Sequence, residues 1–313
     1  MKGEEGANSV NGEKGENGEK SVNGAKGAKR SSIIFSMVLI LALVAGGGYG
    51  CWLRWWQPSR STILETATGY DAVSEPTTLK EVLASAHQSL DEIEHKAGDY
   101  SAIIVKQERI GKQLIETAMF AKIREKPFSV YLRFIARSIN GKDDKSANGR
   151  EVIYVQGRND DKLIAHTPGF LDMTWGKINL APKSVLAMQG ERYPITEIGL
   201  ANLCRQLIQR GESADDPSQV TVKQYPHARI NTRACTLLEI TYPVQEPKTW
   251  GYLARVFMDN ELHFPIRVEV HELPLDRSQG PQLVEEYTYL DLKLNNGYSD
   301  ADFDPKNPQY KFP

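Results

Sequence analysis

Residues 100–124 read YSAIIVKQERIGKQLIETAMFAKIR, and this stretch decides the fold. Gly111 divides it into two runs in which apolar and polar residues alternate. In the second run Met119 falls on one face and Lys122 on the other. A period of two is typical of a half-buried strand. We therefore predict two antiparallel strands joined by a turn at Gly111.

The same alternation recurs along most of the remaining chain. Strands are predicted at 100–109, 113–124, 128–137, 150–157, 161–166, 173–180, 219–224, 235–242, 251–258, 263–273 and 282–294. Their meander order favours antiparallel pairing, and strands of this length curl strongly.

Two segments have helical spacing instead. Thr78 and Glu81 fit a capping box before an apolar stripe, which predicts a helix at 79–96 that ends before Gly98. A second helix is predicted at 196–210. It can serve as a lid over the sheet or simply pack against it. The fold class is therefore α+β, mainly antiparallel β: a strongly curved, unclosed β-barrel of about eleven strands covered by helices.

The chain before this domain divides into three parts. Residues 1–30 are polar and repeat the motif SVNG, which predicts a disordered tail. Residues 31–54 hold an uncharged apolar stretch long enough, at about 1.5 Å per residue, to cross a bilayer as a transmembrane helix. Residues 55–76 are polar and read as a linker, and 77–313 as the globular domain.

Basic residues set the predicted orientation. Lys20, Lys26, Lys29 and Arg30 precede the apolar stretch, whereas Arg54 and Arg60 follow it. The positive-inside rule then places the tail in the cytoplasm and the domain on the other side. Cleavage of the apolar stretch as a signal peptide, or lipidation at Cys51, is the alternative.

Composition and motifs exclude several classes of function. A net charge of -2 gives no reason to expect nucleic acid. The six histidines have no metal-ligand spacing, no nucleophile motif occurs, and we expect neither a cofactor nor an enzyme. Asp300, Asp302 and Asp304 resemble the start of a calcium loop, but Pro305 stands where such a loop needs glycine, so a polar tail is favoured.

Two further features have open interpretations. Cys204 and Cys235 form either a disulfide or two buried thiols. The charges of Lys106-Gln-Glu-Arg109 form either surface ion pairs or a polar rim.

Four segments carry a resemblance to a known fold. They are Asp99–Arg109, Pro127–Phe134, Gly251–Asp259 and Tyr287–Asn295. With them, residues 77–313 resemble the bacterial lipoprotein-carrier fold of LolA, LolB and RseB. The chain also looks like a family of uncharacterised bacterial membrane-anchored proteins that share Lys106–Arg109, Ala187–Gly190 and Asp300–Tyr310. The resemblance implies an apolar interior that takes acyl chains, and a location at the bacterial inner membrane with the domain in the periplasm.

The resulting hypothesis is a membrane-tethered envelope protein that binds a lipid or lipoprotein acyl chain in an apolar cleft. The residues expected to line the cleft are Met119, Val130, Leu132, Phe134, Val256, Met258, Val268 and Leu290. Packing of these side chains against the two helices is the alternative. A second hypothesis is an RseB-type module that senses envelope stress or binds an envelope protein, with the cytoplasmic tail as its output.

Overall fold

The computed structural model describes residues 67–68, 74–167, 176–214, 216–242, 251–274 and 277–313. These residues belong to one compact unit, Pro58–Pro313. The predicted transmembrane segment at 31–54, with the tail before it and most of the linker after it, lies outside the described residues. Within the described part, no helix combines the length and apolarity that a membrane crossing requires.

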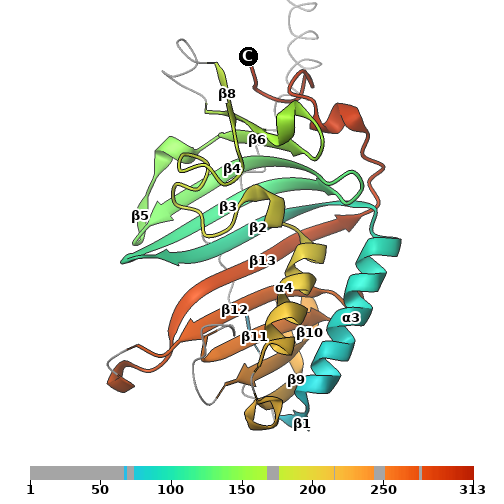
Figure 1. Ribbon diagram of the computed structural model, residues 1–313, viewed down its shortest axis with the longest axis vertical. Coiled ribbons are helices and arrows are strands. Elements are labelled where there is room, and N and C mark those ends of the chain that lie inside the picture. The colour runs from blue at the N-terminus through green and yellow to red at the C-terminus, as the bar shows by residue number, and fades with distance from the viewer. Residues whose placement is uncertain (1–66, 69–73, 168–175, 215, 243–250, 275–276) are drawn as a thin grey trace, which may run out of the picture. The chain divides into compact units, whose positions relative to one another are not determined.

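Thirteen strands form one sheet (Figure 1). They are β1 Glu75–Thr77, β2 Asp99–Ile110, β3 Gln113–Arg124, β4 Ser129–Ile139, β5 Lys142–Asp143, β6 Glu151–Val155, β7 Leu163–His166, β8 Lys177–Leu180, β9 Thr221–Ile230, β10 Arg233–Thr241, β11 Leu253–Asp259, β12 Pro265–Glu272 and β13 Gln282–Leu294. The eleven predicted strands are all present, and the short strands β1 and β5 complete the thirteen.

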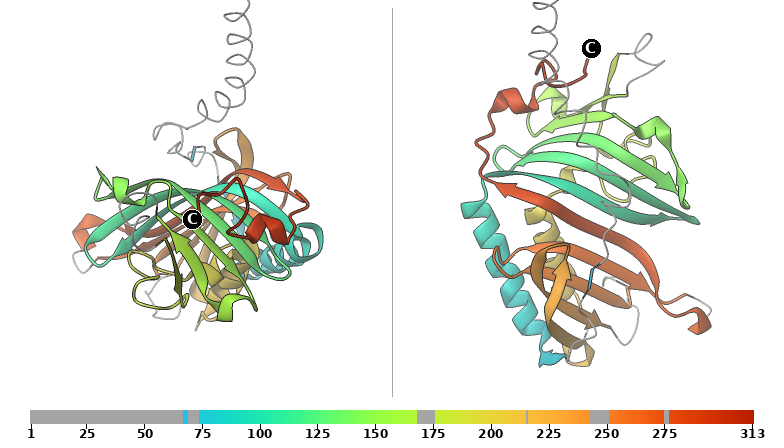
Figure 2. Two further views of the ribbon diagram at one scale, coloured as in Figure 1. Left: turned by 90° about the horizontal axis from the view of Figure 1, so that it is seen from above. Right: turned by 180° about the vertical axis from the view of Figure 1, so that it is seen from behind.

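The strands pair antiparallel in the order β1-β9-β10-β11-β12-β13-β2-β3-β4-β6-β7-β8, and β5 adds to β4. The first and last strands of this order are not neighbours, so the sheet is unclosed over the described residues. Figure 2 shows its strong curvature. The fold class predicted for residues 77–313 is confirmed.

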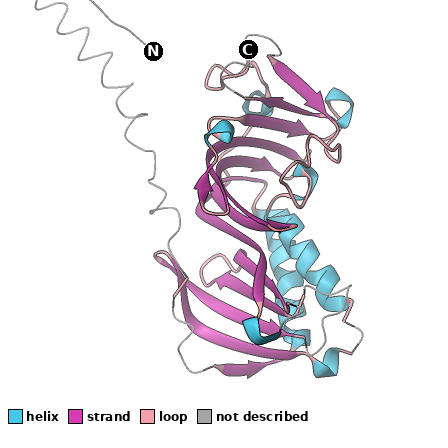
Figure 3. Cartoon of the chain, turned by 90° about the vertical axis from the view of Figure 1, so that its left-hand side faces the viewer, coloured by secondary structure: helices cyan, strands magenta, loops and turns pink. Residues whose placement is uncertain are grey.

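Two α-helices lie on one side of the sheet, as Figure 3 shows. Helix α3, Leu79–Lys96, begins with the predicted capping box, in which the Glu81 N–H donates to the Thr78 hydroxyl at 3.3 Å. Helix α4 spans Leu200–Glu212 and packs against α3. Short 3-10 helices complete the described structure: η1 Lys145–Ala147, η2 Asn159–Asp161, η4 Ile195–Glu197, η5 Pro217–Gln219, η6 Arg277–Gln279 and η7 Asp300–Phe303.

The main core lies between the concave face and the helices. Leu200, Cys204 and Leu207 of α4 and Ile93 of α3 pack there against buried strand residues. Three smaller apolar clusters lie on the convex face. The chain after β13 covers part of that face, where the ring of Tyr310 stacks on Tyr131 with centroids 3.9 Å apart.

Candidate functional site

A cavity of about 940 Å³ occupies one half of the concave face. Its floor is made of apolar side chains from β2, β3, β4, β6 and β7, chiefly Ile104, Met119, Leu132, Phe134, Val152 and Leu163. Gln113 and Ser146 also line it and are exposed, so the cavity reaches solvent at that end. It lies within the range of about 300–1,000 Å³ that is typical of ligand pockets.

The other half of the concave face is filled. A space of about 20 Å³ lies where α3 and α4 meet the strands, beside Leu83, Val256 and Met258. The sheet is therefore covered by helices over one half and hollow over the other. The boundary falls at the start of α4, where Gly199 and Leu203 still line the large cavity.

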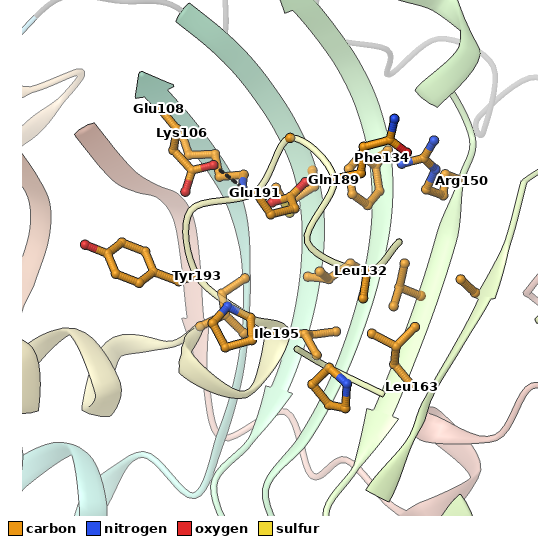
Figure 4. Close-up of a pocket in the computed structure, with 18 of the residues that line it drawn as sticks. Lys106, Glu108, Leu132, Phe134, Arg150, Leu163, Gln189, Glu191, Tyr193 and Ile195 are labelled. Atoms are coloured by element: carbon orange, nitrogen blue, oxygen red, sulfur yellow. Dashed lines mark hydrogen bonds and ion pairs between the residues drawn. The ribbon is translucent and has the colours of Figure 1, made fainter. Parts of the chain in front are cut away.

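A long loop, residues 181–199, roofs the large cavity, and we call it the covering loop. Ala187, Gly190, Tyr193 and Ile195 are among its cavity-lining residues. Figure 4 shows Gln189, Glu191 and Tyr193 of this loop around the cavity, with Leu132 and Leu163 on the strands below. The loop is the whole segment between β8 and α4, so α4 begins four residues later than the predicted helix at 196–210. The sequence singled out Ala187–Gly190 in this loop, but not as a part of the site.

Ion pairs and hydrogen bonds hold the covering loop to the sheet. Lys106 on β2 donates to Glu191 of the loop and, at 2.7 Å, to Glu108. Glu285 on β13 accepts from the Tyr193 hydroxyl at 2.8 Å and pairs with Arg192 at 2.7 Å. The loop is therefore attached to both strands at the centre of the sheet order.

The charged group around Lys106 is buried. Its side chain is 8% exposed and that of Glu108 is 1% exposed. Burial lowers the pKa of Lys106, but the carboxylates of Glu191 and Glu108 outweigh burial and raise it, so the ammonium stays charged. Lys106 and Glu108 therefore line the cavity and do not form a surface ion pair. Of the two interpretations that the sequence left open, the polar rim agrees with their position.

Seven of the eight predicted cleft residues fall into three groups. Met119, Leu132 and Phe134 line the large cavity. Val130 and Val268 are buried in the main core, and Val256 and Met258 border the small space under the helices. Val256 and Met258 therefore pack against the helices, as the alternative interpretation stated. A ligand-binding role for Met119, Leu132 and Phe134 stays a prediction.

Leu290 was expected on the concave face, and the structure places it on the convex one. It packs there with Ile103 and Phe257. Its neighbours Tyr287 and Tyr289 are the residues of β13 that line the cavity. Tyrosine has an apolar ring and a polar hydroxyl, so a pattern that selects only aliphatic residues assigns the wrong face here.

Two arginines at the cavity were also missed. Strict alternation from Phe134 would point Arg137 to the polar face of its strand, but the pairing of β3 with β4 shifts register between Ala118 and Met119. A bulge of this kind changes which side chains point inward. Arg137 therefore lines the cavity, and Arg150 joins it from the residue before β6.

The remaining polar motifs have structural roles. Asp300 pairs with Arg124 at 2.9 Å, and Asp302 pairs with Lys122 at 2.9 Å, as expected for a polar tail. Cys204 and Cys235 are free and buried. Over the part of the chain that is described, no three His, Cys, Asp or Glu side chains are placed to hold a metal ion.

A family of proteins matches this chain by sequence. The model of the family described as "Protein of unknown function (DUF1571)" matches residues 97–312, which include the sheet except β1, and also α4 and the covering loop. No curated protein matches the chain by sequence.

Solved structures show a distant likeness. The Mycobacterium tuberculosis lipoprotein LppX is 15% identical, with 72% of this chain and 99% of that chain covered and a TM-score of 0.40. A putative outer membrane lipoprotein-sorting protein domain from Vibrio parahaemolyticus is 13% identical, with coverage of 72% and 97% and a TM-score of 0.33.

The Pseudomonas aeruginosa MucA/MucB complex holds a third similar chain, 13% identical, with 71% of this chain and 60% of that chain covered and a TM-score of 0.37. These are proteins of the kind that the sequence resemblance named.

Proposed function

We propose that this chain, which belongs to the DUF1571 family, is a membrane-tethered protein of the bacterial cell envelope. It binds a lipid or lipoprotein acyl chain on the concave face of its sheet and catalyses no reaction. The observation that carries this proposal is the cavity of about 940 Å³ with an apolar floor.

Burial of an acyl chain supplies the affinity. Each methylene removed from water contributes about 0.8 kcal/mol, so a chain that occupies even part of the cavity binds usefully. The covering loop excludes water from one side, and the strands exclude it from the other. Because Lys106 and Glu285 hold the loop by ionic contacts at its middle, the loop can separate from the sheet while the strands stay paired.

Tethering remains part of the proposal on sequence grounds. The apolar stretch at 31–54 anchors the chain, the tail at 1–30 lies in the cytoplasm, and the linker at 55–76 keeps the cavity near the bilayer. Residues 77–313 then lie in the periplasm. Labelling of intact cells with a membrane-impermeant thiol reagent, on variants with a cysteine at residue 10 or at exposed residue 112, tests this. Reaction at residue 10 alone would contradict the orientation.

Lipid binding is tested on residues 58–313, which form the compact unit. A fluorescent fatty acid should bind with an affinity in the micromolar range or tighter, and an unlabelled fatty acid should displace it. Absence of saturable binding by a folded sample would reject the proposal.

A second candidate function has one observation in its favour. Val185 and Leu186 of the covering loop are 91% and 56% exposed, which favours contact with an envelope protein at the roof of the cavity. Val185 does not line the cavity, so this protein-interaction role predicts that Val185→Ser abolishes function in cells while leaving fatty-acid binding unchanged. Unchanged function in this variant would reject it.

A further inference from the structure

We propose that Arg137 and Arg150 bind the anionic headgroup of the amphiphile whose acyl chain occupies the cavity. This inference rests on the proposed function and names the class of ligand: a lipid that ends in a carboxylate or a phosphate, and not a neutral one. Both arginines line the same cavity as the apolar floor.

Arg137 is a buried cation with an unused donor. Its side chain is only 8% exposed, and its Nε atom is buried without a hydrogen-bond partner over the described residues. The nearest carboxylate, that of Asp144, lies 3.7 Å from Nε, which is longer than a hydrogen bond. A buried donor without a partner is costly, so a ligand oxygen at this position would stabilise the site.

The position of Arg137 is fixed by its surroundings. A Cβ atom at Gly190 would collide with the guanidinium, so the covering loop touches this arginine through a glycine. Gly190 has a φ of +76°, which other residues rarely adopt. The Ala187–Gly190 segment noted in the sequence therefore ends where the loop closes over Arg137.

Arg150 lies beside it, and over the described residues no carboxylate lies at salt-bridge distance from its guanidinium. Its guanidinium lies 5.4 Å from the centre of the Phe134 ring, which holds it in place at the cavity wall (Figure 4). The Phe134 N–H donates to the Arg150 carbonyl at 2.9 Å, so the backbone is fixed as well. Burial, and then the nearby charge of Arg137, lower the pKa of Arg150 more than the carboxylates of Glu191 and Asp144 raise it, so an anion placed between the two arginines would offset their repulsion.

Two carboxylates near this pair, those of Asp144 and Glu191, also have partners of their own. Asp144 accepts the Ser146 N–H at 3.1 Å, and it also accepts the hydroxyl of Ser146. Glu191 takes the ammonium of Lys106, which is shared with Glu108. Asp144 thus shares its charge between Ser146 and Arg137, and Glu191 is bound to Lys106, so the two guanidinium groups keep donors that face the cavity next to apolar walls that fit a hydrocarbon chain.

Guanidinium chemistry suits an oxygen anion. Its planar fork of N–H donors matches carboxylate and phosphate oxygens and allows two parallel hydrogen bonds. Such charge-assisted bonds favour an anionic over a neutral headgroup by roughly tenfold or more. The headgroup would lie at the arginines with the acyl chain over Leu132 and Met119.

The test uses the full chain in phosphatidylcholine nanodiscs. Three photoreactive probes are compared. Their alkyl chains have the same length and carry a diazirine, and the probes end in a carboxylate, a phosphate or an alcohol. Labelled peptides from β3 and β6 are measured by mass spectrometry. The variants are Arg150→Gln, Arg137→Gln and the charge-preserving Arg150→Lys. Arg133→Gln is the matched control, because Arg133 is exposed on the same strand as Arg137 and lies over Phe120 on the convex side.

In the unaltered chain one or both anionic probes should label the cavity roughly tenfold more than the alcohol, and the preferred acid identifies the headgroup. Arg150→Gln should remove this preference without changing alcohol labelling, which also reports an intact cavity. Arg150→Lys should keep part of it, and Arg133→Gln all of it. Equal labelling by all three probes would overturn this inference and leave the proposed function standing. Absence of cavity labelling by every probe would contradict both.

Discussion

The hydroxyl of Tyr100 on β2 accepts the backbone N–H of Leu200, the first residue of α4, at 2.7 Å. Tyr289 on β13 accepts the N–H of Gly199 in the same way, at 3.1 Å. Because α4 has no capping side chain of its own, the sheet supplies the cap. This contact fixes the end of the helix-filled half of the concave face and the start of the cavity.

Removal of that cap should destabilise the domain. Tyr100→Phe leaves the first N–H of α4 buried without a partner, so the free energy of unfolding should fall by about 1–2 kcal/mol. Urea denaturation followed by circular dichroism measures this. Tyr225→Phe, at a half-buried tyrosine on β9, is the control and should change stability by less than about 0.5 kcal/mol. Equal effects of the two substitutions would contradict a capping role.

Lys106, the buried ammonium at the cavity, should be essential for the stability of the domain and for holding the covering loop. Lys106→Met leaves Glu108 and Glu191 without their ammonium, and such a loss costs about 3–5 kcal/mol. Denaturation at neutral pH should show this loss, and limited proteolysis should cut the covering loop faster. Lys112→Met, at the exposed turn between β2 and β3, should do neither. If Lys106→Met were as stable as that control, the loop would not be held by this ion pair.

Glu125 should make stability depend on pH. Burial raises its pKa to about 7, although Arg205 opposes the shift. Between about 4.5 and 7 the folded state then binds more protons than the unfolded state, so the free energy of unfolding decreases as pH rises. Glu125→Gln should remove about 1–3 kcal/mol of this decrease between pH 5 and pH 8.

Chemical denaturation at several pH values tests this. Glu75→Gln, at an exposed position of β1, serves as the control and should keep the wild-type profile. A profile for Glu125→Gln that matches this control would show that Glu125 does not titrate differently in the folded state.

The two described cysteines should resist modification. Both are buried and free, and burial raises the pKa of Cys204 to about 12 and that of Cys235 to about 11. Little thiolate is present at pH 8, so iodoacetamide should leave both unmodified in the folded protein and label both in urea. Peptide mass spectrometry distinguishes these sites from Cys51. Loss of labelling in urea that is restored by a reductant would instead indicate a disulfide.

Much of the sheet was predictable because one face of each strand is buried. The period of two gave β3 its observed bounds, Gln113–Arg124, and placed Met119 on the concave face. Helix α3 was equally clear, because the Thr78 and Glu81 capping box marks its first turn. These are local signals, and a single sequence contains them completely.

The site was less predictable because it depends on residues that are far apart. Lys106 finds its partner Glu191 in a loop 85 positions later in the chain. Arg137 turns inward because of a register shift in β4, which strict alternation does not foresee. The covering loop has no period at all, and two glycines with positive φ, Gly190 and Gly199, mark where it approaches the sheet closely.

The central claim is that the cavity on the concave face holds an acyl chain, and blocking that cavity tests it most directly. Ala165 on β7 lines the cavity, so Ala165→Trp fills it, whereas Ala234→Trp adds the same ring at an exposed position of β10. Both variants and the unaltered chain are purified from a bacterial membrane, and bound lipid is quantified by mass spectrometry. We predict near-stoichiometric lipid in the unaltered chain and in Ala234→Trp, and at least a tenfold loss in Ala165→Trp. Equal amounts of lipid in all three proteins would contradict the account.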